Sequence, residues 1–156
     1  MPRLPEVQNC AAIARHLNRS MDYLNLTNGT AFDVITVECA GAPFSHAAND
    51  YACFKDLIGK YGVYVFQDKT TNEVLYVGEA YKQDLKTRVK QNYTENDTGG
   101  TFRRNFCDVE HKSFHDFKNL LSGSSLKAIS IVTSSMVLIG AIEAILIAAL
   151  KPKYNK

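Results

Sequence analysis

The fold is decided by the stretch Gly62-Val63-Tyr64-Val65-Phe66, which is followed after a short polar segment by Leu75-Tyr76-Val77-Gly78. Both runs are rich in β-branched and aromatic residues, and residues 67–73 between them are polar and turn-forming, so the stretch predicts a β-hairpin. A symmetric turn would place Tyr64 opposite Tyr76 and the two glycines opposite each other. Because side chains alternate between the faces of a strand, the tyrosines would share one face and the valines the other. Two phenols beside accessible backbone favour a ligand site on that face.

Length and composition indicate one globular domain, or one domain with a small extension, because the chain has 156 residues and 46% of them are apolar. The net charge of +2 is compatible with a nucleic-acid partner but does not identify one. The four cysteines include no C-x-x-C pair, and the first residues lack the apolar run of a signal peptide. We therefore expect reduced thiols and a cytoplasmic location.

The rest of the chain predicts both helices and strands. Residues 6–24 carry apolar side chains at spacings of three and four, which is typical of an amphipathic helix. The other expected helices cover residues 51–58, 84–93, 136–150 and a short segment that begins at residue 101, and the other expected strands cover residues 32–39 and 126–132. Residues 136–150 are too few for a membrane span, which needs about 20 apolar residues, so we expect a buried core helix and no membrane partner.

Glu143 is the only charged residue in the apolar segment Met136–Leu150. A buried carboxylate is costly unless it is paired, hydrogen-bonded or bound to a metal. One interpretation is a salt bridge, for which Arg88 is the candidate partner. The other is a metal ligand or an acid/base group at the open edge of the core.

Two further groups of residues carry possible chemistry. Cys107, His111 and His115 are spaced by four, so on one helix they would share a face in the manner of metal ligands, but two unrelated surface histidines are the simpler interpretation. The adjacent arginines Arg103 and Arg104 either bind phosphates or belong to a solvated helix face.

The motifs taken in order resemble the GIY-YIG nuclease family. Gly62-Val63-Tyr64 and Tyr76-Val77-Gly78 stand where the two name-giving motifs would be, each with valine in place of isoleucine. An arginine, a glutamate and an asparagine follow in the expected order, and Arg88, Glu143 and Asn155 match them. The run from Glu143 to Asn155 looks like the end of this domain in the bacterial excision-repair incision subunit. The resemblance covers about residues 60–156.

The resemblance implies an α+β fold in which helices flank a small three-stranded antiparallel sheet. Residues 60–156 would form this domain, and residues 1–59 would form an N-terminal extension with a helix, a strand and a short helix, packed on the core. The sequence is compatible with both a monomer and a homodimer.

The resemblance also implies the hydrolysis of DNA phosphodiester bonds with one divalent metal ion, Mg²⁺ or alternatively Mn²⁺. Tyr64 would be the general base, assisted by Tyr76 or by a lysine, and Arg88 would neutralise the phosphate. Glu143 would bind the metal, and Asn155 would orient Glu143 or a metal-bound water. The DNA-binding residues would be Lys86, Lys90, Arg103 and Arg104.

Two positions depart from the family pattern. Where relatives often have histidine or tyrosine, four residues after the arginine, this chain has Asn92, so either Tyr93 takes that role or the role is absent. Where some relatives have lysine after the second motif, this chain has Glu79, and Lys82 is the candidate substitute. These departures keep open the alternative of a catalytically silent DNA-binding or interaction module. Otherwise we expect a stand-alone restriction-type or repair nuclease.

Overall fold

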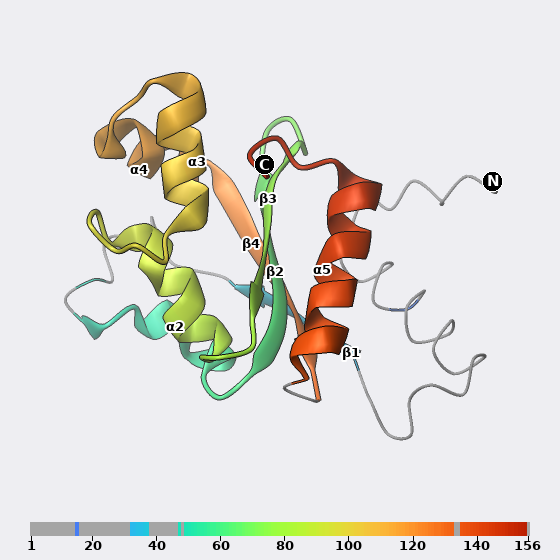
Figure 1. The fold of residues 1–156 in the computed structure, drawn as a ribbon. Coiled ribbons are helices and arrows are strands. Elements are labelled where there is room, and N and C mark those ends of the chain that lie inside the picture. Colours follow the sequence, from blue (N-terminus) through green and yellow to red (C-terminus); the bar gives the residue numbers. More distant parts are fainter. Residues whose placement is uncertain (1–14, 16–31, 38–46, 48, 133–134, 156) are drawn as a thin grey trace.

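The structure is a computed structural model that describes residues 15, 32–37, 47, 49–132 and 135–155. Its centre is a four-stranded antiparallel sheet with the strand order β1-β4-β2-β3 (Figure 1). The strands are β1 (Phe32–Val37), β2 (Tyr61–Asp68), β3 (Val74–Ala80) and β4 (Ser124–Ile131). Strand β3 therefore lies at one edge of the sheet. The helix expected over residues 6–24 lies, apart from residue 15, outside the described residues.

Among the residues described from 49 onwards, helices cover both faces of the sheet, with the long helix α5 on one side and α2, α3 and α4 on the other (Figure 1). The helices are α2 (Leu85–Lys90), α3 (Thr101–Glu110), α4 (Phe114–Ser122) and α5 (Met136–Leu150), with short 3-10 helices η2 (Ala52–Leu57) and η3 (Gln91–Tyr93). Two helices have side-chain N-caps: the Asp84 side chain accepts from the N–H of Thr87, and the Ser135 side chain accepts from that of Leu138. No helix of the described ranges has the length and the apolar character that a membrane span needs.

The predicted α+β class is confirmed, but the predicted number of strands is wrong. Residues 32–37 form β1, which pairs with β4, so the sheet has a fourth strand. The sequence indicated a strand here, yet its partner lies about a hundred residues later in the chain. Alternation shows that a strand is present but does not identify the strand beside it.

The predicted register of the hairpin is also wrong, by two residues. Tyr64 lies opposite Gly78 and Phe66 lies opposite Tyr76, with an irregularity between Phe66 and Gln67. Because side chains alternate with a period of two, a shift of two residues leaves every side chain on its expected face. Tyr64 and Tyr76 therefore do share a face, with ring centroids 6.1 Å apart.

The expectation of four reduced cysteines is not met at Cys53, which is disulfide-bonded, whereas Cys107 is a free thiol. A disulfide depends on the distance between two sulfurs in the folded chain, which sequence spacing does not give. The cytoplasmic location, which was inferred partly from reduced thiols, stays an untested prediction.

Candidate active site

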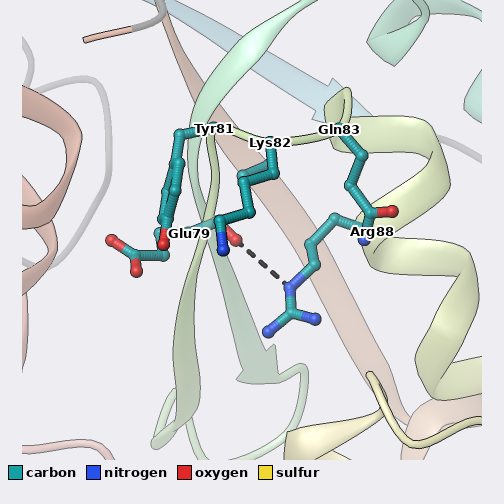
Figure 2. A pocket seen from close by; sticks show the side chains of 6 residues that line it. Glu79, Tyr81, Lys82, Gln83 and Arg88 are labelled. Atoms are coloured by element: carbon teal, nitrogen blue, oxygen red, sulfur yellow. Dashed lines mark hydrogen bonds between the residues drawn. The ribbon is translucent and has the colours of Figure 1, made fainter. Parts of the chain in front are cut away.

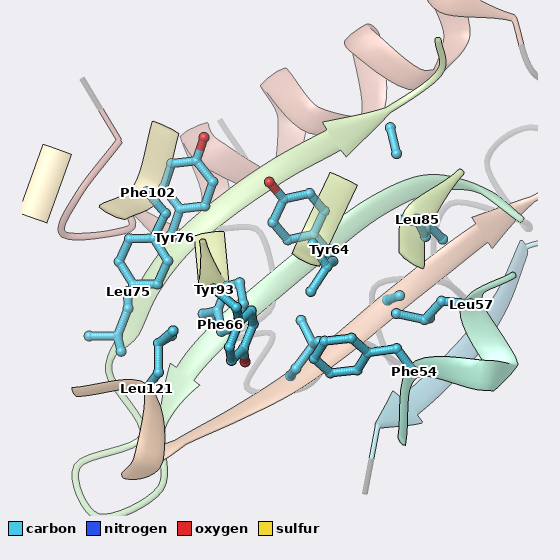
Figure 3. Packing of buried hydrophobic residues seen from close by; sticks show 14 of the residues in the cluster. Phe54, Leu57, Tyr64, Phe66, Leu75, Tyr76, Leu85, Tyr93, Phe102 and Leu121 are labelled. Carbon is cyan, nitrogen blue, oxygen red and sulfur yellow. The ribbon is translucent and has the colours of Figure 1, made fainter. Parts of the chain in front are cut away.

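The predicted site residues gather around the edge strand β3. Tyr64 and Tyr76 lie on the face that α2 and α3 cover, in one cluster of buried side chains. Figure 3 shows the Tyr64 hydroxyl directed toward β3, the strand that carries Tyr76. Glu143 belongs to α5, on the other face. Because no described strand pairs with the outer side of β3, groups from the two faces can act together past this edge.

The glycine of the second motif makes room for Tyr64. A Cβ atom on Gly78 would overlap the Cζ and Oη atoms of Tyr64, so the phenol lies directly against this backbone. The glycine of the first motif serves a different contact: Gly62 has a φ of 149°, and a Cβ there would overlap the carbonyl oxygen of Ile129 in β4. Both motif glycines are thus explained by close approaches across the sheet.

Both phenols are held in the neutral form. Burial raises the pKa of Tyr64 far above its usual value, and the neighbouring phenol of Tyr76 adds to this, while the charge of Arg88 opposes it. Burial also raises the pKa of Tyr76, where the charge of Glu143 acts in the same direction and Arg88 again opposes it. A base role for Tyr64 therefore requires further positive charge beside it.

The positive charge of Arg88 acts on both tyrosines. Its Nε donates to the main-chain oxygen of Glu79 at 3.3 Å, and its Nη1 donates to Gln91 Oε1 at 2.9 Å and to the Gly99 carbonyl at 3.0 Å. Among the described residues Nη2 has no hydrogen-bond partner. Arg88 lines a cavity of about 330 Å³ together with residues 79–83, and Figure 2 shows its guanidinium and Lys82 on the same side of β3.

Gln91 fixes the guanidinium, and sequence analysis did not assign it a role. Its Oε1 accepts from Arg88 and also from Gln83 Nε2 at 2.8 Å. A Cβ atom on Gly99 would overlap the Gln91 side chain, so this loop glycine makes room for the amide. The signal in the sequence was the spacing of three residues between Arg88 and Gln91, which places both on one helix face.

Glu143 is half-buried and faces a second carboxyl group. Burial, a hydrogen bond with Glu79 and the charge of Glu79 together raise its pKa to about 8, and the charge of Arg88 opposes the shift. No ion pair joins Glu143 to Arg88 in the part of the chain that the structure describes. Arg88 therefore influences Glu143 through its charge at longer range, and the simple salt-bridge interpretation is wrong.

The predicted DNA-binding residues have different environments. Lys86 and Lys90 both pair with Asp50, at 3.2 and 2.6 Å. Arg104 is exposed, and its charge lowers the pKa of Tyr76, so it lies within electrostatic range of the site.

Arg103 is an internal residue, which corrects its predicted role on the surface. Only 5% of it is exposed, and its guanidinium donates to the main-chain oxygens of Gln91, Thr94 and Asp97. It therefore holds the loop after α2 and has no donor group directed to solvent for DNA. Adjacent arginines on a helix point in directions about 100° apart, and the sequence did not show which of them faced inward.

Asn155 also has a different role from the expected one. Its Oδ1 accepts from the N–H of Val77 at 2.9 Å and its Nδ2 donates to the Val77 carbonyl at 2.8 Å. The side chain thus pairs with the outer edge of β3 as another strand would, and both its polar atoms are used there. It positions β3 and the chain end, and no described contact joins it to Glu143.

Asn92, and not Tyr93, lies beside Tyr64. Tyr93 packs against Tyr51 and Phe54, with ring centroids 5.4 Å apart in both pairs. Asn92 is fully buried, its Oδ1 accepts from the Arg103 N–H, and its amide lowers the pKa of Tyr64. Its Nδ2 makes no hydrogen bond of normal geometry within the described residues. The printed ring contacts of Tyr93 are thus with Tyr51 and Phe54, and the hypothesis that it replaces the family's histidine or tyrosine stays a prediction.

Cys107, His111 and His115 do not share a helix face. Helix α3 ends at Glu110, His111 adopts a left-handed conformation with a φ of 53°, and α4 begins at Phe114. The described residues contain no group of three or more His, Cys, Asp or Glu side chains that could hold a metal ion.

The donor set at Glu143 nevertheless suits a divalent cation. Mg²⁺ binds oxygen ligands and commonly keeps several waters while taking one or two carboxylates from the protein. Glu143, with Glu79 beside it, supplies carboxylate oxygens of the kind that such a cation takes from a protein.

The comparison with known proteins agrees with this geometry. Residues 53–127 match the family model of the GIY-YIG catalytic domain, which includes both tyrosine motifs and Arg88 and ends before Glu143. No curated protein and no solved structure is significantly similar to the chain. Residues 53–127 are therefore similar to the GIY-YIG catalytic domain, and the sheet and the position of the two motifs agree with this similarity.

Proposed function

We propose that the protein is a metal-dependent DNA endonuclease. The family consists generally of endonucleases that depend on divalent metals, and a nuclease domain implies DNA as the substrate. The observation that carries the proposal is the position of Arg88, whose charge acts on Tyr64, Tyr76 and Glu143 while its Nη2 remains available. Four residues distant in sequence thus act on one another at the edge of β3.

In this proposal Arg88 binds the scissile phosphate. A guanidinium pairs with two phosphate oxygens at once and stabilises the negative charge that develops during hydrolysis. The contacts of Arg88 with Gln91 and Gly99 hold it in place before substrate binds, so little reorganisation is needed. Lys82 lines the same cavity and adds positive charge for the DNA backbone.

Tyr64 is the proposed general base: in its deprotonated form the phenolate oxygen would accept a proton from the attacking water. Its raised pKa makes the neutral phenol the resting state, so the phenol would first lose its own proton to solvent, which positive charge from Arg88 and from a metal held at Glu143 would favour. Tyr76 lies next to it and positions the water. A divalent cation held at Glu143 supplies Lewis-acid chemistry for the leaving oxygen when it is bound.

The alternative function, a silent DNA-binding or interaction module, is favoured by Asn92. An amide cannot exchange a proton as histidine does, and the buried Tyr64 beside it is hard to ionise. The presence of Arg88 and Glu143 supports the enzyme over this alternative. Whether an active enzyme serves in restriction or in repair, and whether it is a monomer or a homodimer, remain predictions of the sequence.

The test is the nicking of supercoiled plasmid DNA with Mg²⁺ or Mn²⁺ by the native chain and by Glu143→Ala, with Glu73→Ala as the exposed control. We expect cutting by the native chain and the control and none by Glu143→Ala. If native and variant bind DNA equally and neither cuts, the silent module is correct. Mapping the ends then distinguishes defined sites, expected for restriction, from random or structure-dependent cuts, expected for repair.

A further inference from the structure

Glu79 projects from β3 toward α5. It has the same parity along the strand as Val77, which is buried beneath α5 together with Ile139 and Ile142. Its Oε2 lies 3.6 Å from where a Cβ atom on Gly140 would stand, so the carboxylate rests against α5. Gly140 is three residues before Glu143, which places the two acids over the same face of this helix.

The Glu79 carboxylate is not neutralised by Arg88. The guanidinium bonds to the main-chain oxygen of Glu79, and Figure 2 shows the Glu79 carboxylate pointing away from it. Neither Glu79 nor Glu143 forms an ion pair among the residues that the structure describes. Two carboxyl groups on the same face of α5 therefore lie close together without an ion pair to a cationic side chain among the described residues.

Two carboxylates close together supply oxygen donors of the kind that a divalent cation binds, and a cation between them would offset their like charges.

We propose that Glu79 is a second protein ligand of the divalent cation, so that Glu79 and Glu143 bind it with two carboxylates. The inference rests on the proposed function, in which Glu143 binds the metal. Waters and phosphate oxygens complete the octahedral set that Mg²⁺ prefers. A cation at this place adjoins the cavity of Arg88 at the edge of β3.

The test measures Mn²⁺ binding without DNA, by calorimetry at pH 8.5, so that it does not depend on activity. The chains compared are the native protein, Glu79→Gln, Glu143→Gln and the control Glu73→Gln, an exposed glutamate at the start of β3. We expect each of the first two variants to weaken Mn²⁺ binding by about tenfold or more, as loss of a direct ligand should. The control should bind as the native chain does.

Thermal unfolding without metal shows that the variants are folded. Glu79→Gln removes one of two facing carboxylates, so its midpoint should lie at or above that of the native chain at pH 8.5, and added Mn²⁺ should raise it less. Glu79→Asp, which keeps the charge on a shorter side chain, should retain part of the Mn²⁺ affinity.

The outcomes separate the two proposals. If Glu143→Gln loses Mn²⁺ while Glu79→Gln binds it as the native chain does, Glu79 is not a ligand and the proposed function stands. If neither substitution changes binding, the cation does not bind at this pair and the metal role of Glu143 fails as well.

Discussion

The two faces of the sheet beside β3 differ in how they hold their functional groups. On the α2 and α3 face, the tyrosines sit in a buried aromatic cluster, in which the rings of Tyr76 and Phe102 stack with centroids 5.0 Å apart (Figure 3). On the α5 face, aliphatic side chains form the core, and the carboxyl of Glu143 is half-buried at its border. The first face fixes geometry through packing, and the second leaves its acids accessible to a cation. The site thus combines a rigid side and an ion-accessible side.

The largest expected effect is on the rate of DNA cleavage, when the positive charge of Arg88 is removed. Arg88→Ala should reduce single-turnover DNA cleavage by about 10²–10³-fold, because a preorganised donor to the developing negative charge is lost. Arg88→Lys should restore little, since an ammonium cannot form the two-point contact. Lys55→Ala, which removes an exposed positive charge that has no role in the proposed site, is the control and should cut normally. Equal rates for Arg88→Ala and the control would remove Arg88 from the mechanism.

The packing on the α2 and α3 face can be tested at Gly78, against which the Tyr64 ring lies. Gly78→Ala places a methyl group into the Tyr64 ring, so the free energy of unfolding should fall by about 1–3 kcal/mol, as overpacking usually costs. Gly123→Ala is the control, because its nearest neighbour would lie at an ordinary 3.7 Å. Urea unfolding of both variants checks this. Equal stability of the two would mean that Tyr64 does not lie against Gly78.

The edge between the two faces depends on Asn155. Asn155→Ala removes both hydrogen bonds to Val77, and we expect a loss of about 1 kcal/mol in unfolding free energy. The exposed Asn96→Ala should change stability little. Native Mn²⁺ affinity in Asn155→Ala would support the structural role, whereas normal stability with lost affinity would favour the original hypothesis that Asn155 orients Glu143.

The last expected effect is a pH dependence of the free energy of unfolding, caused by Glu143 on the α5 face. The pKa of Glu143 is raised from 4.5 to about 8, so between these values the folded chain binds more protons than the unfolded chain. In the absence of metal, stability should therefore fall as pH rises from about 5 to 8 and level off above that. Thermal midpoints in EDTA should show this slope in the native chain and a weaker one in Glu143→Gln. Parallel curves would show that Glu143 is not the group responsible.

Much of the candidate site was predictable because its motifs have local causes. The alternating hairpin, the helix after Asp84 and the apolar helix carrying Glu143 follow from periodicity and capping, and the structure contains each of them. The shared face of Tyr64 and Tyr76 survived an error in register because that error was an even number of residues.

Other features were not predictable, since they depend on neighbours distant in the chain. Arg103 is buried because its guanidinium donates to three main-chain carbonyls. The Asn155 side chain forms hydrogen bonds with Val77 because no described strand pairs with the outer edge of β3. The position of Glu79 beside Glu143 depends on how α5 lies across the strand. None of these contacts leaves a periodic trace in the sequence.

The sequence by itself determined which elements form and which residue types are available for chemistry: two tyrosines, an arginine and a carboxylate on an apolar helix. The reason is that strand alternation, helix periodicity and capping act over a few residues. Only the tertiary structure decided which of these groups act together, which polar side chains serve the fold, and that a second acid faces Glu143. Those decisions depend on the packing of α5, α2 and β3 around one sheet edge, where the contacts join residues separated by tens of positions.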